Sequence, residues 1–238
     1  MGTRGCYGFR KNGEDKLAYN HYDSYPDCLG ASIVKFCKAT SVTEMNEIFD
    51  RIILVEEDSK PTKKQITECI EFYDESVGSQ SVEDWYCLLR EAQGDLNAYK
   101  NGLKYMVDNC DFIKNSLFCE YAYIINLDTN CLEFWKGFQH KPCKGNRYGT
   151  ETYDNLDKYY PCKMISYYAL DTEKTTEEII ADMNVMANKA DNDDDYDNED
   201  QERDVTSDDL HSIGEHIKNG FTSGCLDNGI EWRLEFDI

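Results

Sequence analysis

The sequence predicts an α+β fold in which helices pack on a mainly antiparallel sheet formed by an N-terminal and a central hairpin. Three observations lead to this prediction. Strand-like segments lie near both ends of residues 1–172, helix-like segments lie between them, and each group of strands contains a tight-turn sequence. A change of composition near residue 174 adds a small C-terminal helix–strand appendage to the prediction.

The N-terminal hairpin is predicted from residues 3–10 and 16–22, which flank the segment KNGED. Asn12-Gly13 within that segment is a strong hairpin turn signal, because both residue types accept the left-handed backbone that such turns require. The segment DSYPDCLG follows and predicts a turn, since the residue before a proline is held extended and Asp and Ser side chains cap turns.

Four helical segments follow the hairpin. Residues 31–40 are amphipathic, and residues 41–52 begin with a Ser/Thr cap and an early glutamate. Residues 60–73 carry Pro61 at the helix start. Residues 81–102 have apolar side chains at helical spacing, with a break near Gly94.

The central hairpin is predicted from residues 116–138, SLFCEYAYIINLDTNCLEFWKGF. Two β-rich apolar runs are joined there by Asp128-Thr129-Asn130, which is typical of a hairpin connection. Residues 159–170, YYPCKMISYYAL, predict a fifth strand after a loop rich in lysine, glycine and tyrosine.

These elements divide the chain into three predicted parts: a main α+β domain over 1–172, a helix and acidic linker over 173–205, and a helix–strand module over 206–238. The linker contains nine acids and one arginine between residues 191 and 204. Such a run predicts a solvated segment that contributes nothing to a core. The last module is too short to fold well alone, so we expect it to dock on the main domain or on a partner.

The formal net charge of −22 argues against direct binding to nucleic acid and against binding to an anionic membrane surface. It favours either simple solubility or an acidic face that binds a basic protein partner. The chain is 40% apolar and can therefore build a core. No apolar run has the roughly 18 residues that a membrane span needs.

The eleven cysteines are odd in number and irregularly spaced, and most of them lie inside apolar segments. This pattern predicts reduced thiols that behave as small hydrophobic residues, as expected in the cytosol. The N-terminus MGTRG lacks the basic and apolar run of a secretory signal. Gly2 invites a myristoylation hypothesis, but Cys6 stands where that motif needs serine or threonine.

A catalytic hypothesis for the first hairpin takes Cys6 as nucleophile, His21 as base and Asp23 as the group that orients the base. Residues 21 and 23 share one strand face, and residue 6 lies across the hairpin from residues 19 to 21. The alternative is a purely structural hairpin, because no nucleophile turn surrounds Cys6. An N-terminal nucleophile is disfavoured, since removal of Met1 exposes Gly2, which has no side chain.

A ligand-binding hypothesis rests on Arg4 and on a basic loop that contains Lys141, Lys144 and Arg147. Neither Arg4 nor His21 is needed to build the turn, and a fixed guanidinium at residue 4 would suit an anionic group. The basic loop stands out in so acidic a chain, but an ordinary hairpin flank is the simpler explanation of it. No phosphate-cradling glycine motif is present, and no cofactor is predicted.

No metal site is predicted. No two cysteines have the C-x-x-C spacing, and His211 and His216 lie five residues apart and diverge on a helix. Six acids of the linker fall at the ligand positions of a calcium-loop frame. Tyr196, however, replaces the glycine that the sharp turn of such a loop needs, and Asn198 replaces its usual apolar residue.

The combination MGTRG…GFR…YNHYDSYP, with DWYCLLREAQGDL, SLFCEYAYIINLDTN and LEFWKGF, resembles a family of uncharacterised proteins of bacteriophages, prophages and bacteria. The ending EHIKNGFTSG, followed by a tryptophan-containing strand, is similar to a small module appended to several phage proteins. The resemblance implies a mobile-element protein of the bacterial cytosol and implies no reaction. Two hypotheses follow: an accessory protein that binds a basic host or phage protein, and a small cysteine-dependent hydrolase or transferase.

Overall fold

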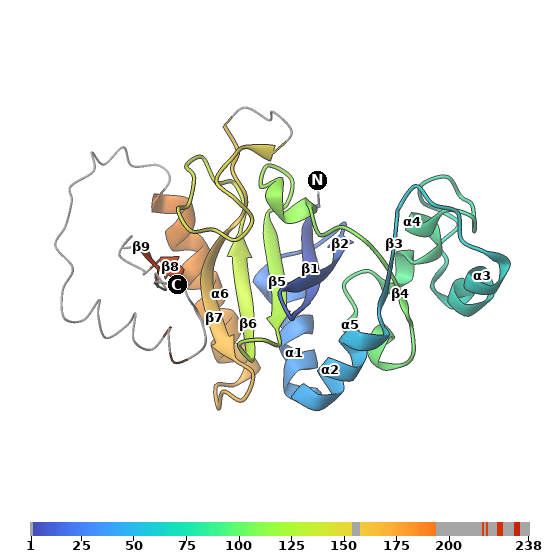
Figure 1. The fold of residues 1–238 in the computed structure, drawn as a ribbon, viewed down its shortest axis with the longest axis horizontal. Coiled ribbons are helices and arrows are strands. Elements are labelled where there is room, and N and C mark those ends of the chain that lie inside the picture. Colours follow the sequence, from blue (N-terminus) through green and yellow to red (C-terminus); the bar gives the residue numbers. More distant parts are fainter. Residues whose placement is uncertain are drawn as a thin grey trace, which may run out of the picture.

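The computed structural model describes residues 2–153, 158–193, 216, 218, 223–225 and 231–233. The predicted α+β class is confirmed, with a five-stranded sheet in the order β2-β1-β5-β6-β7 at its centre (Figure 1). The strands are β1 Gly5–Lys11, β2 Glu14–Asn20, β5 Tyr121–Asn126, β6 Cys131–Lys136 and β7 Lys163–Ala169. All neighbouring pairs are antiparallel except β1 and β5, which run parallel.

Both predicted hairpins are confirmed, and their turns are tied together. Asn12 and Gly13 have φ angles of 53° and 76°, as a tight turn between twisted strands requires. The Asp128 carboxylate in the turn between β5 and β6 accepts the backbone N–H of Asn12 at 2.6 Å and that of Gly13 at 3.0 Å. One side chain therefore fixes the end of the N-terminal hairpin against the central hairpin.

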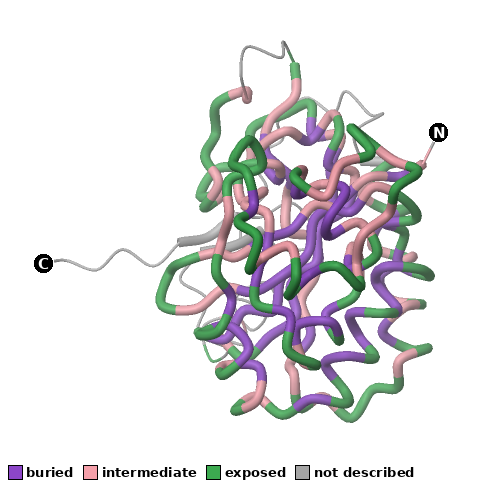
Figure 2. The backbone as a smooth tube through the Cα atoms, turned by 90° about the vertical axis from the view of Figure 1, so that its right-hand side faces the viewer, coloured by how far each residue is buried: buried purple, intermediate pink, exposed green. Residues whose placement is uncertain are grey.

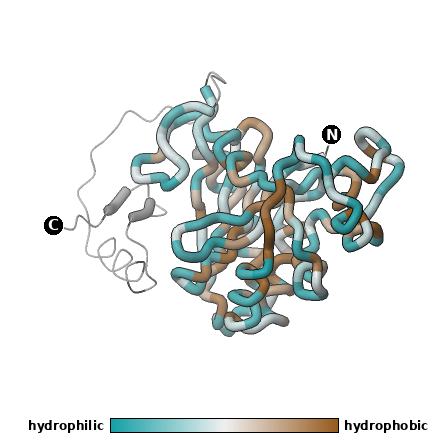
Figure 3. Tube along the Cα trace, turned by 45° about the vertical axis from the view of Figure 1, so that its right-hand side comes forward, coloured by the Kyte–Doolittle hydropathy of each residue, from teal (hydrophilic) through white to brown (hydrophobic). Residues whose placement is uncertain are grey.

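Each face of the sheet has its own core. On one face, Tyr7, Phe9, Tyr123 and Phe134 pack against helices and form the larger cluster. On the other face, Ala122, Ile124 and Trp135 are among the residues that pack with residues 110–119 and with Tyr148 and Cys162. Buried backbone follows the strands through the molecule in Figure 2, and the most hydrophobic segments lie in the same interior region in Figure 3.

Helices α1 Ala31–Ala39, α2 Val42–Arg51 and α6 Thr176–Asp193 contribute to the larger core. Ser41 caps α2 by accepting the N–H of Glu44, as its sequence predicts. Residues 26–30 of the predicted turn form a short π-helical segment, Pro26–Gly30, that leads directly into α1. The helix predicted within residues 173–205 is α6, and its Ile179 and Met183 are buried in the same core as α1.

A second lobe lies beside the β2 edge, on the right of Figure 1. It contains β3 Ile53–Val55 and β4 Tyr105–Val107, a parallel pair that the sequence analysis did not predict. Its helices are short, α3 Lys63–Cys69 and α4 Trp85–Leu88, whereas α5 Leu96–Lys100 lies beside α1. Three 3-10 turns complete the described helical elements, namely Ile70–Phe72, Arg90–Ala92 and Phe112–Lys114.

The predicted breaks in this region have clear causes. Thr62 and Gln65 form a capping box that starts α3 after Pro61. The helix predicted over residues 81–102 is interrupted at Gly94, whose φ of 80° cannot belong to a helix. Asp84 and Asp95 cap the pieces on either side of the break.

The C-terminal part contributes strands β8 Ser223–Cys225 and β9 Glu231–Arg233, which pair antiparallel. The His216 ring lies 4.8 Å from the ring of Tyr167 in β7, so the module contacts the main sheet. Most of the acidic run 191–204, with the calcium-loop frame, and His211 lie outside the described residues. Among the described helices, none has the length and apolar character to cross a membrane.

Candidate functional site

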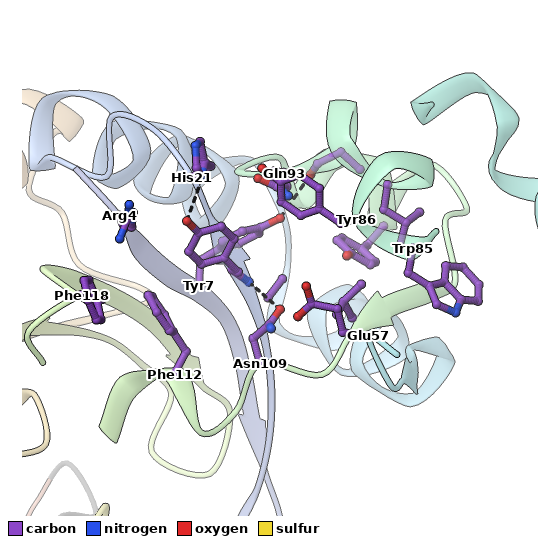
Figure 4. Close-up of a pocket in the computed structure, with 16 residues that line it drawn as sticks. Arg4, Tyr7, His21, Glu57, Trp85, Tyr86, Gln93, Asn109, Phe112 and Phe118 are labelled. Carbon is purple, nitrogen blue, oxygen red and sulfur yellow. Dashed lines mark hydrogen bonds between the residues drawn. The ribbon is translucent and has the colours of Figure 1, made fainter. Parts of the chain in front are cut away.

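A cavity of about 510 Å³ lies where the N-terminal hairpin meets the second lobe (Figure 4). Its walls come from the hairpin, from residues 85–93 around α4, from Tyr99 in α5, from residues 107–118 at and after the end of β4, and from Glu57. The wall is strongly aromatic, because seven rings line it: Tyr7, Tyr19, Trp85, Tyr86, Tyr99, Phe112 and Phe118. A volume of this size and an aromatic wall with a few polar groups are typical of small-molecule sites.

Arg4 brings a positive charge into this aromatic wall. Its backbone is fixed between β1 and β5, where its N–H donates to a Glu120 carboxylate oxygen and its carbonyl accepts the Glu120 N–H. The guanidinium lies 5.4 Å from the centre of the Phe118 ring. Within the described part of the chain, this guanidinium makes no hydrogen bond and no ion pair. It is therefore available to an anion.

His21 stands next to Arg4 at the cavity rim. Its Nδ1 lies 2.8 Å from the Tyr19 hydroxyl, so Tyr19 orients the imidazole. Burial, followed by the positive charges of Arg90 and Arg4, lowers the pKa of His21 below its ordinary value of 6.5. The imidazole is therefore mainly neutral at pH 7 and can donate or accept a hydrogen bond.

Arg90 extends the positive field around the rim. Its guanidinium lies 4.9 Å from the centre of the Tyr22 ring and 5.9 Å from that of Tyr86. It donates a hydrogen bond to the Gln93 side chain at 2.8 Å, and it has no ion pair within the described residues. A protein with a net charge of −22 thus carries, beside one aromatic cavity, two arginines that form no ion pair with any acid of the described part of the chain.

The structure does not join the predicted trio of Cys6, His21 and Asp23. Cys6 is fully buried in the smaller core, and its nearest polar contact is the Cys119 sulfur at 3.8 Å. His21 instead lines the cavity and pairs with Tyr19. The Asp23 side chain is exposed, and within the described residues no hydrogen bond connects it to His21. The thiol therefore has no contact with the cavity.

Of the predicted ligand-binding residues, only Arg4 reaches this cavity. Arg147 lies on the other core face, where it donates two hydrogen bonds, of 2.7 and 2.5 Å, to the fully buried carboxylate of Glu133. That geometry explains the arginine structurally, because a buried carboxylate needs a partner. Lys141 and Lys144 are exposed in the loop before it and do not line the cavity.

Each of the ten cysteines from Cys6 to Cys162 is a free thiol. Three of them meet in the smaller core, since the Cys162 sulfur contacts the Cys119 carbonyl at 3.2 Å beside Cys6. Burial raises the pKa of the Cys119 thiol well above its ordinary value. No group of three or more His, Cys, Asp or Glu side chains in the described residues is arranged to hold a metal ion.

Several site residues carry no signal in the sequence. Trp85 lies at helical spacing with apolar neighbours, which predicts a core residue, and Phe118 lies in a strand-like run. Glu57 is the middle one of three consecutive acids, and Arg90 follows two leucines in a predicted helix, so neither stands out from its neighbours. Only the hairpin contributes two residues that the sequence singles out, Arg4 and His21, and both line the cavity.

Comparison with models of protein families, with curated proteins and with solved structures finds no match to this chain.

Proposed function

We propose that the protein binds a small planar anion in the cavity beside β2. The observation that carries this proposal is the Arg4 guanidinium, which makes no hydrogen bond and no ion pair among the described residues and lies in an aromatic wall. Arginine recognises carboxylate and phosphate groups through parallel hydrogen bonds, and aromatic walls stack on planar ligands. His21 and the field of Arg90 add to the preference for negative charge.

The test measures binding of indole-3-acetate and of its uncharged analogue indole-3-acetamide by calorimetry. We expect the anion to bind more tightly than the amide. Arg4→Ala should lower the affinity for the anion by about tenfold or more, because one charge-assisted interaction is lost. Lys35→Ala, which removes one exposed positive charge outside the cavity, is the matched control and should leave binding unchanged. Equal binding of both compounds would contradict the proposal.

We also propose, as a second function, binding of a basic protein in the bacterial cytosol. The net charge of −22 supports it, because so strong a charge attracts basic surfaces over distances of several ångströms. A pull-down from bacterial lysate at low and moderate salt tests it, and failure to retain any partner at both salt concentrations would argue against it. The cysteine-dependent hydrolase hypothesis gains no support from a Cys6 that is fully buried outside the cavity.

A further inference from the structure

Glu57 is the one acidic side chain among the described residues that line the cavity. The residue is exposed, and within the described residues it makes no hydrogen bond and no ion pair, so its carboxylate is open to a ligand. Figure 4 shows its carboxylate on a different side of the cavity from Arg4, with Tyr86 and Trp85 on the Glu57 side and Phe112 and Phe118 on the Arg4 side. The cavity therefore has a positive end and a negative end separated by aromatic rings.

A ligand that satisfies both ends must carry an anion at one end and hydrogen-bond donors at the other. A free amino acid does not fit this arrangement, because its carboxylate and ammonium groups share one carbon and cannot reach opposite sides of a cavity. A nucleotide does fit, because its phosphate and the far edge of its base lie at opposite ends of the molecule. The aromatic walls suit a base as well, since every base has a flat face that can stack on a ring.

The carboxylate also discriminates between bases. It has two acceptor oxygens and no donor, so it pairs best with an edge that presents two adjacent N–H donors. Guanine presents N1–H beside its exocyclic amino group, whereas adenine presents an acceptor nitrogen beside its amino group. An acceptor placed against a carboxylate is repelled, and a good bidentate pair discriminates between the two bases by roughly tenfold or more.

Building on the proposed function, we infer that the cavity takes a purine mononucleotide with a guanine-type edge, with its phosphate at Arg4 and its base edge at Glu57. The phosphate then accepts hydrogen bonds from the Arg4 guanidinium and from the His21 imidazole. The base donates hydrogen bonds to the Glu57 carboxylate and stacks on the aromatic rings of the second lobe. The Asn109 side chain lies in the same wall, fixed because its carbonyl oxygen accepts the backbone N–H of Tyr19 at 3.1 Å.

The experiment is calorimetric titration of the full chain with guanosine 5′-monophosphate, adenosine 5′-monophosphate and guanosine. We expect the guanine nucleotide to bind at least about tenfold more tightly than the adenine nucleotide, in line with the bidentate pair. Glu57→Gln should abolish this difference, because its amide offers only one acceptor. Glu56→Gln removes the same charge one residue away, outside the cavity wall, and should leave the difference intact. Arg4→Ala should lower the affinity for both nucleotides by a similar factor and leave the affinity for guanosine, which has no phosphate, unchanged.

The outcomes separate this inference from the proposed function. If both nucleotides bind with equal affinity, or if Glu57→Gln leaves the preference unchanged, the guanine-edge inference is overturned while anion binding stands. If indole-3-acetate binds in an Arg4-dependent manner and neither nucleotide binds, the inference is likewise overturned alone. If none of these anions binds, both the inference and the proposed function fail.

Discussion

The Tyr19 hydroxyl lies 2.8 Å from Nδ1 of His21, and this contact joins the edge strand of the sheet to the rim of the cavity. The Tyr19 ring also meets Phe112 edge-on at 5.1 Å, so the imidazole is held by a side chain that is itself packed. Burial raises the pKa of that tyrosine above its ordinary value of 10.0. Tyr19 therefore remains a neutral hydroxyl throughout the range in which His21 titrates.

His21 should make stability depend on pH. Its folded pKa is lowered, so between the folded pKa and 6.5 the unfolded state binds more protons than the folded state. The stability that neutral His21 contributes is complete above pH 6.5 and decreases as the pH falls through the folded pKa. Urea unfolding measures the free energy of unfolding at pH 7.5 and at pH 5.5. Its decrease between the two pH values should be larger for the natural protein than for His21→Gln. An equal or larger decrease in the variant would contradict the lowered pKa of His21.

Arg147 should be needed for stability, because Glu133 is fully buried. That carboxylate also accepts from Asn126 Nδ2 at 2.7 Å and from Trp135 Nε1 at 3.0 Å, but Arg147 is the cation with which it forms an ion pair. Arg147→Met should therefore lower the free energy of unfolding by about 3 kcal/mol, the usual cost of leaving one buried charge unpaired. Urea denaturation measures this cost.

Two further variants complete that test. Lys141→Met removes an exposed charge from the same loop and should change stability by no more than about 0.5 kcal/mol. Adding Glu133→Gln to Arg147→Met should recover part of the lost stability, because the buried charge is then gone. An Arg147→Met protein as stable as the natural one would show that the pair contributes nothing.

The cysteines should react with iodoacetamide in an order set by burial. Cys28 is exposed and should be alkylated first in the native protein. Cys6, Cys119 and Cys162 are fully buried and should be modified only after unfolding in urea. Mass spectrometry of timed samples at pH 8 gives the order. Labelling of Cys6 as fast as Cys28 would reveal an accessible thiol and would restore the hydrolase hypothesis.

Asp128 should stabilise the joined hairpins. Asp128→Ala removes the acceptor of two turn N–H groups and should cost about 1 kcal/mol, since both hydrogen bonds are exposed to solvent. Asp128→Asn retains one acceptor oxygen and should cost less. Asp58→Ala, an exposed acid in another turn, is the control for the loss of charge. Thermal unfolding of the three variants would rank them, and equal midpoints for Asp128→Ala and the control would contradict the role.

The sequence allowed accurate prediction of elements whose signals are local. Asn12-Gly13 identified the first hairpin, and Ser41 identified the start of α2, because a turn or a cap depends on residues a few positions apart. The pairs β1–β5 and β3–β4 were not predicted. Gly5 pairs with Tyr121 and Ile53 with Tyr105, and no local pattern encodes partners so far apart.

In the candidate site, too, residues with a local signal could be predicted and residues placed by long-range contacts could not. Arg4 and His21 could be singled out, because neither is explained by the turn beside it. Glu57 and Phe118 could not, because they join the wall only through long-range packing of the second lobe. Arg147 was assigned to ligand binding because its loop is basic, and its buried partner Glu133 lies within an apolar strand sequence that gave no reason to expect a charge.

The parallel pairing of β1 with β5 also has a consequence for synthesis of the chain. During translation β1 and β2 emerge first, and a two-stranded hairpin alone is at best marginally stable in water. The neighbour that completes the sheet around β1 begins only at Tyr121, so Tyr7 and Phe9 remain without their buried environment until half of the chain has been made. Phe112 and Phe118, which line the cavity, are synthesised only shortly before β5. Nascent chains that stop before β5 would therefore expose the hairpin as an unpaired edge, open to aggregation and proteolysis.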